Sequence, residues 1–208
     1  MLKIKICGIT NAEDAQRACE YGADALGFVF AKSPRMINPE NASRITRQIP
    51  PFIAKVGVFV DADKAFVIKA IKKCKLDTLQ FHGHESDKYC SFFRKYCKII
   101  KAFRIKESSD MESIEKYIHV NAYLFDSYSR DIYGGTGIAF AHGLLKNRNF
   151  KRPIIIAGGI NEKNCGQIAA LLHPFAFDVS SSIESNPGKK DLGKMKNIIK
   201  KVKLIKNS

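Results

Sequence analysis

The chain has 208 residues, of which 45% are hydrophobic and 26% are charged, and its formal net charge is +15. A chain of this length and composition buries a hydrophobic core without disulfides, which excludes wholesale disorder and predicts one domain over residues 1–208. No apolar run approaches the roughly 20 residues of a membrane helix, so we expect no membrane partner. The excess of 35 Lys and Arg over 20 Asp and Glu favours phosphate-bearing ligands.

The first residues, Met1–Cys7, interleave Lys with apolar side chains and lead into further patterned sequence, which is typical of a strand rather than a signal peptide. The six cysteines include no Cys-x-x-Cys pair, which argues against a zinc or thioredoxin-like site. Without a secretion signal, we expect reduced thiols and a cytoplasmic protein.

Short apolar, β-branched runs recur along the chain, with helical patterns between them. Their starts are 21 to 32 residues apart, the length of a strand, a loop and a helix of three turns. The runs are Ile4–Cys7, Ala25–Phe30, Ile53–Val60, Thr78–Phe81, Ile99–Phe103, Ala122–Phe125, Ile154–Ala157 and Ala176–Val179. Eight such repeats predict an α/β fold, a closed (β/α)8 TIM barrel of parallel strands, because an open doubly wound sheet has fewer strands and its Gly-x-Gly-x-x-Gly fingerprint is absent. Chemistry in such barrels sits where strands end and helices begin.

The first strand ends at Cys7-Gly8, where a thiol points into the barrel mouth and glycine leaves space beside it. An ordinary thiol has a pKa of about 8.5, and we expect positive surroundings to lower it. The helix that follows opens with Thr10 and Glu13 at the spacing of a capping box, and Gly22 stands where a left-handed residue ends a helix.

Polar side chains also follow the second and fourth strands. Arg35, a few residues beyond the second strand, can hold a carboxylate or phosphate through two parallel hydrogen bonds. His82 follows the fourth strand and has His84 two residues further on, the spacing of a pair of metal ligands. Because no third strand-end ligand accompanies them, we expect no metal site and interpret His82 as a polar contact in the site wall.

The sixth strand ends at Asp126, across an eight-membered ring from the first strand. A carboxylate in this place can also cap a loop. Paired with Cys7 across the cavity, it supplies an acid and a base on two sides of a substrate.

Three turns rich in glycine or hydroxyl side chains follow the last strands, namely Gly134–Gly137, Gly158–Asn161 and Ser180–Ser182. Glycine allows backbone N–H groups to approach an anion closely. The last two turns follow strands seven and eight, where barrels frequently bind phosphate. Together the turns predict a phosphorylated ligand.

The C-terminal stretch Lys189–Ser208 contains eight lysines and a single acid, Asp191. Its apolar residues recur at steps of three or four, which predicts a packed helix with the lysines on the outer face. They are Leu192, Met195, Ile199, Val202 and Ile205. The positive charge therefore does not by itself indicate a nucleic-acid partner, and we expect none.

Several of these motifs occur together in one known family. They are Lys5–Thr10, Gly27–Phe30 with Ser33–Arg35, Val56–Phe59, Leu79–Gly83, Gly134–Gly137, Ala157–Ile160, Phe177–Glu184 and Pro187–Asp191. In this combination the chain resembles the phosphoribosylanthranilate isomerases of tryptophan biosynthesis over essentially its whole length.

The resemblance implies an Amadori rearrangement of N-(5-phosphoribosyl)anthranilate to 1-(2-carboxyphenylamino)-1-deoxyribulose 5-phosphate, without a cofactor. It implies that Asp126 is the general acid, that Cys7 is the general base as a thiolate, and that Arg35 grips the anthranilate carboxylate. It also implies that further residues contact the substrate, Gln80, His82 and Asp178, or its phosphate, Gly135, Gly137, Gly158, Gly159, Ser180 and Ser181. A monomer and a homodimer both remain open.

Two positions depart from the family pattern. Ala141 stands where the family commonly has Asp, which puts a supporting hydrogen bond or helix cap in doubt. Ser182 stands where the family usually has Gly, and we expect it to stiffen or narrow the phosphate turn. Neither departure removes the proposed acid–base pair.

Four other functions compete with this interpretation. The histidine-pathway aminoaldose isomerase performs the same rearrangement with Asp in the place of Cys7. Indole-glycerol-phosphate synthase requires a catalytic Lys/Glu set that the strand ends lack, and ribulose-phosphate epimerases need a metal for which only His82 is suitably placed. The last alternative is a basic nucleic-acid-binding scaffold whose site has decayed at Ala141 and Ser182.

Overall fold

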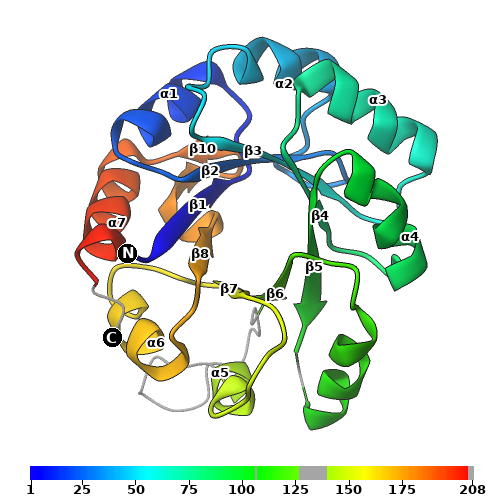
Figure 1. Cartoon of the computed structure of the whole chain (residues 1–208). Coiled ribbons are helices and arrows are strands. Elements are labelled where there is room, and N and C mark those ends of the chain that lie inside the picture. The colour runs from blue at the N-terminus through cyan, green and yellow to red at the C-terminus, as the bar shows by residue number, and fades with distance from the viewer. Residues whose placement is uncertain (106, 127–139, 206–208) are drawn as a thin grey trace.

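Eight parallel strands close into a barrel in the order β1 to β8 (Figure 1). The computed structural model describes residues 1–105, 107–126 and 140–205. The strands are β1 (Lys3–Cys7), β2 (Ala25–Val29), β3 (Ala54–Phe59), β4 (Thr78–Phe81), β5 (Lys98–Arg104), β6 (Ala122–Asp126), β7 (Ile154–Ala157) and β8 (Ala176–Val179). Each run predicted from the sequence forms one of these strands, and the predicted (β/α)8 barrel is confirmed.

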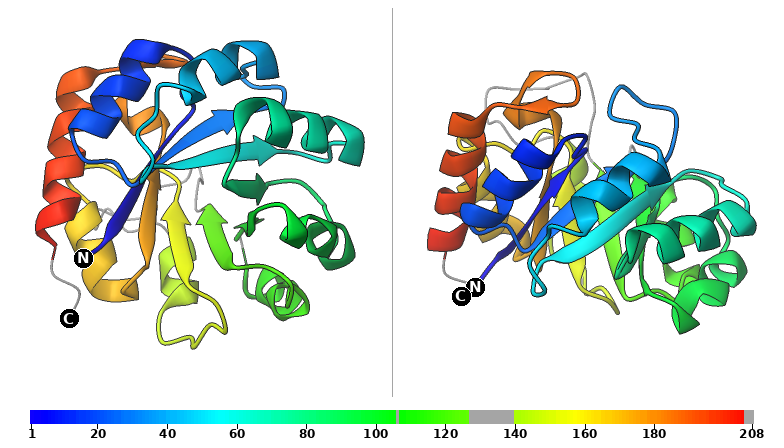
Figure 2. Two further views of the ribbon diagram at one scale, coloured as in Figure 1. Left: turned by 45° about the horizontal axis from the view of Figure 1, so that its top comes forward. Right: turned by 90° about the horizontal axis from the view of Figure 1, so that it is seen from above.

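The helices surround the barrel on its outside (Figure 2). They are α1 (Ala12–Glu20), α2 (Pro39–Thr46), α3 (Lys64–Cys74), α4 (Asp87–Phe92), α5 (Phe140–Leu145), α6 (Cys165–Leu172) and α7 (Leu192–Leu204). In the described parts of the chain, three 3-10 segments contribute to the connections, namely η1 (Phe93–Lys95), η2 (Ser108–Lys116) between β5 and β6, and η3 (Ser181–Ile183) after β8. A short hairpin of β9 (Glu184–Asn186) and β10 (Lys189–Lys190) then leads into α7.

The first helix is capped one residue later than the sequence pattern predicts. The Asn11 side chain accepts a 2.8 Å hydrogen bond from the Asp14 backbone N–H, so Asn11 is the N-cap. The predicted Thr10 cap is wrong, because the Thr10 hydroxyl instead donates to the Gly188 carbonyl of the β9–β10 turn. Gly22 follows the helix with φ +96°, a left-handed conformation, as predicted.

The interior of the barrel is divided into an apolar and a polar part. Buried apolar side chains gather on the last four strands, Ile100, Ala102, Ala122, Leu124, Ile155, Ala157 and Ala176. Polar side chains occupy interior positions on β1, on β4 and nearer the carboxyl end of β8, namely Lys5, Gln80 and Asp178, and all three are buried. Side chains two apart on a strand share a face, so Lys5 lies on the same side as Cys7.

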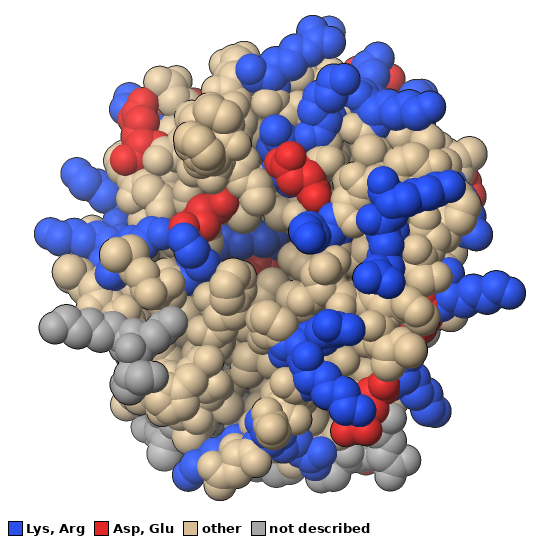
Figure 3. Space-filling view, in the orientation of Figure 1, with Lys and Arg blue, Asp and Glu red and all other residues tan. Residues whose placement is uncertain are grey.

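The basic C-terminal segment forms the predicted amphipathic helix, α7. Its apolar residues Met195, Ile199 and Val202 are buried, whereas Lys194, Lys196 and Lys200 are exposed. On the face of the molecule in Figure 3, Lys and Arg side chains lie both at the rim and around the central hollow, with Asp and Glu side chains between some of them. Within the described residues, no helix has the length and hydropathy needed to cross a membrane.

Candidate active site

A cavity of about 520 Å³ opens at the carboxyl ends of the strands. Ten of the residues predicted for the site line it: Cys7, Arg35, Gln80, His82, Asp126, Gly158, Gly159, Asp178, Ser180 and Ser181. The other two, Gly135 and Gly137, lie outside the described residues. The fold therefore brings a thiol from β1 and a carboxyl group from β6 to one cavity.

Cys7 is held by a lysine that the sequence reasoning missed. The Lys5 Nζ donates hydrogen bonds to the Cys7 Sγ at 3.3 Å, the Gln80 Oε1 at 2.6 Å and the Asp178 Oδ2 at 2.8 Å. The ammonium group thus has an acceptor for each of its three protons. The signal for Lys5 was present in the sequence, because alternation along a strand places it beside Cys7.

The surroundings of Cys7 shift its pKa upward, not downward as the sequence reasoning expected. Burial raises the pKa of the Cys7 thiol, and the negative charge of Asp178 raises it further. The positive charges of Lys5 and Lys190 and the hydrogen bond from Lys5 oppose this shift without reversing it. Desolvation decides the direction, because the charged thiolate loses more from leaving water than the neutral thiol does.

A second group of polar contacts leads from Gln80 to Asp126. The Gln80 Nε2 lies 3.2 Å from the His82 Nδ1, and an amide N–H that donates there leaves the imidazole proton on Nε2. That Nε2 lies 3.4 Å from the Asp126 Oδ2, within ion-pair distance although outside hydrogen-bond geometry. Together with the Lys5 contacts, these side chains form a continuous polar path across the barrel mouth from Cys7 to Asp126.

Arg35 has a carboxylate partner within the chain. Its Nε and Nη2 donate to the two Glu184 carboxylate oxygens at 2.7 and 2.6 Å. The Lys190 Nζ lies 3.0 Å from the same carboxylate. A guanidinium has five N–H donors, so this pairing leaves donors for a ligand carboxylate. Gly8 makes the arrangement possible, because a Cβ at that residue would lie 2.6 Å from the Arg35 Cδ.

The turns after β7 and β8 form one side of the cavity. Gly158 and Gly159 both have positive φ, +82° and +68°, which glycine adopts without strain. A Cβ on Gly159 would meet no atom within 4 Å, so its backbone borders open space. The Ser180 hydroxyl donates to the Cys7 carbonyl, which joins this turn to β1. The Ser182 hydroxyl donates to the Ile160 carbonyl, so this departure from the family pattern links the two turns.

The other departure from the family pattern is Ala141, whose side chain lies outside the described part of the structure.

Two further cations, Lys32 and Arg104, also line the cavity, and the sequence did not indicate them. Arg104 ends β5 and is paired in register with Asp126 on β6. They add positive charge at the mouth, where an anionic ligand would enter.

His82 and His84 do not form a metal-binding pair. His82 faces the cavity, whereas His84 is exposed and pairs with Asp61 at 3.1 Å. In the described part of the chain, no three His, Cys, Asp or Glu side chains converge on a common point.

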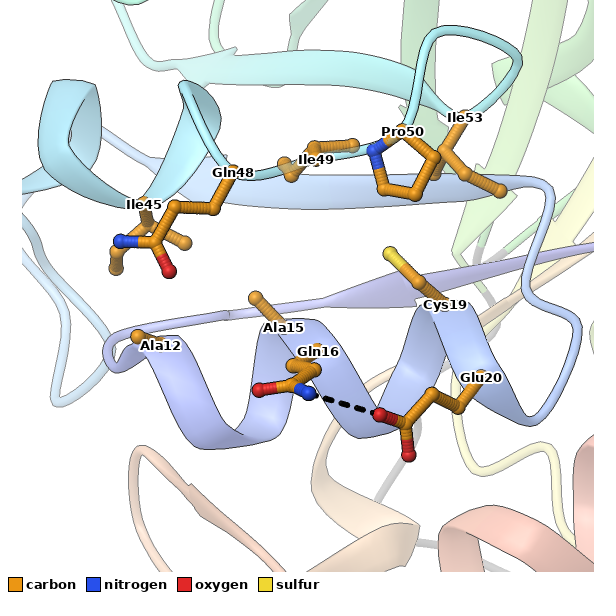
Figure 4. Close-up of a pocket in the computed structure, with 10 residues that line it drawn as sticks. All are labelled: Ala12, Ala15, Gln16, Cys19, Glu20, Ile45, Gln48, Ile49, Pro50 and Ile53. Atoms are coloured by element: carbon orange, nitrogen blue, oxygen red, sulfur yellow. Dashed lines mark hydrogen bonds between the residues drawn. The ribbon is translucent and has the colours of Figure 1, made fainter.

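A second hollow, of about 560 Å³, lies on the outside of the barrel between α1 and the segment after α2 (Figure 4). Its walls are mainly apolar, with Ala15, Cys19 and Ile49 among them, and the Gln16 amide donates to Glu20 along its edge. It offers neither an acid–base pair nor a cluster of glycine turns, so the cavity at the strand ends is the candidate active site.

The chain is similar to named proteins over nearly its full length. A family model described as N-(5'phosphoribosyl)anthranilate (PRA) isomerase matches residues 4–201. The N-(5'-phosphoribosyl)anthranilate isomerase of Citrifermentans bemidjiense is 45% identical over 206 residues, which are 99% of this chain and 98% of that protein.

Solved structures agree with the sequence relatives. A phosphoribosyl anthranilate isomerase in complex with reduced 1-(o-carboxyphenylamino)-1-deoxyribulose 5-phosphate superimposes with a TM-score of 0.87 at 37% identity, covering 99% of this chain and 100% of that one. A structure of monomers made from the dimeric Thermotoga maritima enzyme gives a TM-score of 0.83 at 35% identity, with the same coverage. The chain therefore belongs to the N-(5'-phosphoribosyl)anthranilate isomerase family, the aldose–ketose isomerases of tryptophan biosynthesis.

Proposed function

We propose that this chain catalyses the Amadori rearrangement of N-(5-phosphoribosyl)anthranilate to 1-(2-carboxyphenylamino)-1-deoxyribulose 5-phosphate, with Asp126 as general acid and Cys7 as general base. The observation that carries the proposal is that these two side chains line one cavity, from β1 and β6. An acid and a base on different walls can act on two atoms of one bound sugar.

Asp126 acts first in the proposed sequence. It gives its proton to the furanose ring oxygen, the bond between that oxygen and C1 breaks, and the nitrogen lone pair forms an iminium with C1. The carboxylate that Asp126 becomes then faces the His82 Nε2, 3.4 Å away. A donor in that position stabilises the carboxylate and so assists the proton transfer.

Cys7 acts second, as a thiolate. It takes the proton from C2 of the sugar, the electrons of the C–H bond form a C1–C2 double bond, and the iminium electrons return to nitrogen. The resulting enolamine tautomerises to the ketone. The positive iminium also offsets the negative charge of Asp178, which together with burial raises the thiol pKa. We infer that Cys7 loses its proton most readily once the iminium has formed.

Asp178 offers the substrate an acceptor. Its Oδ2 receives the Lys5 ammonium, but its Oδ1 is buried and has no hydrogen-bond partner among the described residues. A buried carboxylate oxygen without a donor is costly, and a substrate N–H or hydroxyl in the cavity removes that cost. We propose that Asp178 orients the amino-sugar in this way.

The two anionic ends of the substrate match the two sides of the cavity. The relative's ligand carries a carboxyphenyl group and a 5-phosphate. In this chain, Arg35 is suited to the carboxylate, because it lines the cavity and its contacts with Glu184 leave further N–H donors on the guanidinium. The Gly158, Gly159, Ser180 and Ser181 turn backbones are suited to the phosphate.

The direct test mixes the purified enzyme with N-(5-phosphoribosyl)anthranilate and follows the loss of its fluorescence. We expect turnover, and no change with heat-denatured protein. The same assay with the histidine-pathway aminoaldose tests the alternative activity. Turnover of that compound alone would overturn the proposed substrate, and turnover of both would indicate dual specificity.

We further propose that the protein works as a homodimer joined at the end of the barrel away from the cavity. Large apolar side chains are exposed around the amino-terminal ends of the strands, Met1, Phe52, Ile118, Phe175 and Leu204, and Phe52 is 96% exposed. Phe52→Asp should yield monomers in sedimentation, whereas Met36→Asp, an exposed apolar residue near the opposite end, should not. Monomeric wild-type protein would contradict the proposal.

The free cysteines bear on the cellular compartment in which the protein works. All six cysteines are free, and four besides Cys7 are buried. A cytoplasm keeps such thiols reduced. We therefore propose a cytoplasmic enzyme, which labelling of the cell fractions with an antibody to the protein would test.

A further inference from the structure

We propose that Lys5 is the buried counter-charge that stabilises the thiolate of Cys7 when it forms and fixes the direction of the sulfur toward the substrate. The proposal rests on the assignment of Cys7 as the base. Lys5 is a positioning residue in this account, because it acts through the thiol and the carboxylate beside it rather than on the sugar.

Three hydrogen bonds fix the position of the Lys5 ammonium group. Lys5 is only 4% exposed, and its Nζ contacts the Cys7 Sγ, the Gln80 Oε1 and the Asp178 Oδ2 at 3.3, 2.6 and 2.8 Å. These acceptors come from three strands, β1, β4 and β8. Because Gln80 on β4 and Asp178 on β8 hold the ammonium group in place, it cannot turn toward solvent, and its third N–H stays directed at the sulfur.

The charges around Cys7 make a cation necessary. With a neutral thiol, Lys5 and Asp178 form a buried pair of zero net charge. When Cys7 ionises, two anions share one ammonium in a region of low dielectric constant, where charge interactions are strong. Without Lys5, the thiolate would face the Asp178 carboxylate with no charge compensation at hydrogen-bond distance.

The other charged groups that act on Cys7 are more distant. Asp178 on β8 disfavours the thiolate, Lys190 on β10 favours it, and Arg35 in the β2–α2 loop interacts with it electrostatically. Lys190 and Arg35 are both occupied by Glu184, at 3.0 and 2.6 Å. Lys5 is the cation in contact with the sulfur among the described residues.

Gly27 on β2 keeps the space in which the two side chains meet. A Cβ at this residue would lie 2.7 Å from the Cys7 Sγ and 2.9 Å from the Lys5 Cε. Real Cβ atoms do not approach so closely, and any side chain would push the thiol and the lysine stem apart. The absence of a side chain at Gly27 therefore makes the Lys5–Cys7 contact possible.

The test measures the thiol itself rather than turnover. The rate of Cys7 alkylation by iodoacetamide is followed against pH by peptide mass spectrometry, in wild type, Lys5→Met and Asp178→Asn. Loss of the cation should raise the midpoint, and loss of the anion should lower it. On the alkaline side of neutrality but below the midpoint, we expect Lys5→Met to react on the order of tenfold more slowly. An unchanged midpoint in Lys5→Met, or shifts of the two variants in the same direction, would overturn the proposal.

Two further variants keep the result decisive. Lys3→Met removes a lysine from the same strand that is partly exposed and paired with Asp24, so it should leave the Cys7 midpoint unchanged. If Lys5→Met does not fold, Lys5→Met/Asp178→Asn removes both members of the buried pair and is compared with Asp178→Asn alone. The proposal requires the added Lys5→Met to raise the midpoint there too.

The enzymatic pH profile separates this proposal from the proposed function. In Lys5→Met the acidic limb of kcat/KM should move to higher pH, so that the loss of rate shrinks as pH rises. A purely structural defect would lower the rate equally at every pH. If Cys7→Ala keeps its turnover, the assignment of Cys7 as base fails, while the alkylation data still decide whether Lys5 controls the thiol.

Discussion

Arg35 and Glu184 are joined by two parallel hydrogen bonds of 2.7 and 2.6 Å, although 149 residues separate them in the chain. The pair ties the β2–α2 loop to the segment after β8, and it fixes the plane of the guanidinium at the cavity edge. A guanidinium held in this way is prepared to accept a second, planar anion at low entropic cost.

The first prediction concerns this pair. Arg35→Met should raise KM for the phosphoribosyl substrate more than it lowers kcat, because it removes a contact made in both the ground state and the transition state. Glu184→Gln keeps the shape of the partner and should give a smaller effect in the same direction. Steady-state kinetics of both variants check this. A fall in kcat at unchanged KM would show that Arg35 serves the chemical step instead.

The second prediction concerns acid stability. Although burial opposes it, the hydrogen bond from Arg35 and the charge of Lys190 lower the pKa of Glu184 below its ordinary value of 4.5. A carboxyl group with a lowered folded-state pKa stabilises the fold above its unfolded-state pKa, and this contribution is lost as pH falls through the folded-state value. The free energy of unfolding should therefore decline below about pH 4.5. Denaturant titrations of Glu184→Gln should show a shallower decline than those of wild type.

The third prediction concerns the pH dependence of catalysis. A base acts only when deprotonated, and the pKa of Cys7 is raised by burial and by Asp178. In the free enzyme, kcat/KM should therefore still rise with pH above about 8.5, the ordinary thiol pKa. Because the iminium offsets the charge of Asp178, the acidic limb of kcat should lie at lower pH than that of kcat/KM. Coincident limbs would count against the role of the iminium.

The fourth prediction concerns the loop that carries His82. The Lys101 ammonium is buried and donates to the Phe81 carbonyl at 3.2 Å, the Gly83 carbonyl at 2.7 Å and the Glu85 carboxylate at 3.2 Å. It thus holds the backbone on both sides of His82. Lys101→Met leaves Glu85 buried without its cation and should lower the free energy of unfolding by about 3–5 kcal/mol.

Urea denaturation measures this loss. Lys98→Met, which removes an exposed lysine from the same strand, is the control and should change the free energy of unfolding by less than about 0.5 kcal/mol. An equal effect of both substitutions would show that the buried lysine does not support the loop.

Much of the fold and part of the site follow from the sequence. The spacing of the apolar runs predicts all eight strands, because each strand–helix unit of a barrel needs a similar length of chain. Once the barrel is inferred, the strand ends place Cys7 and Asp126 at its mouth. The sequence pattern places the start of the first helix one residue early, since Thr10 and Asn11 both suit a cap and only the contact of Thr10 with Gly188 decides between them.

The remaining features depend on tertiary contacts. The partner of Arg35 stands 149 residues away, and no local pattern indicates it. The direction of the Cys7 pKa shift depends on how deeply the thiol is buried, and the net charge of the chain does not indicate this burial. The alternation along β1 places Lys5 on the same face as Cys7, but a lysine is rarely buried unless its charge is paired. Its burial follows only from the closed barrel and from Gln80 and Asp178.

The roles of Cys7 and Asp126 are decided by the turnover of N-(5-phosphoribosyl)anthranilate by Cys7→Ala and Asp126→Asn, with Cys19→Ala as the control for loss of a thiol outside the cavity. Each of the two site substitutions should lower kcat by at least about a hundredfold while the circular dichroism spectrum and the melting temperature stay near those of wild type. The control should have the kcat of wild type. Near-normal kcat in either site variant would contradict the role given to that residue.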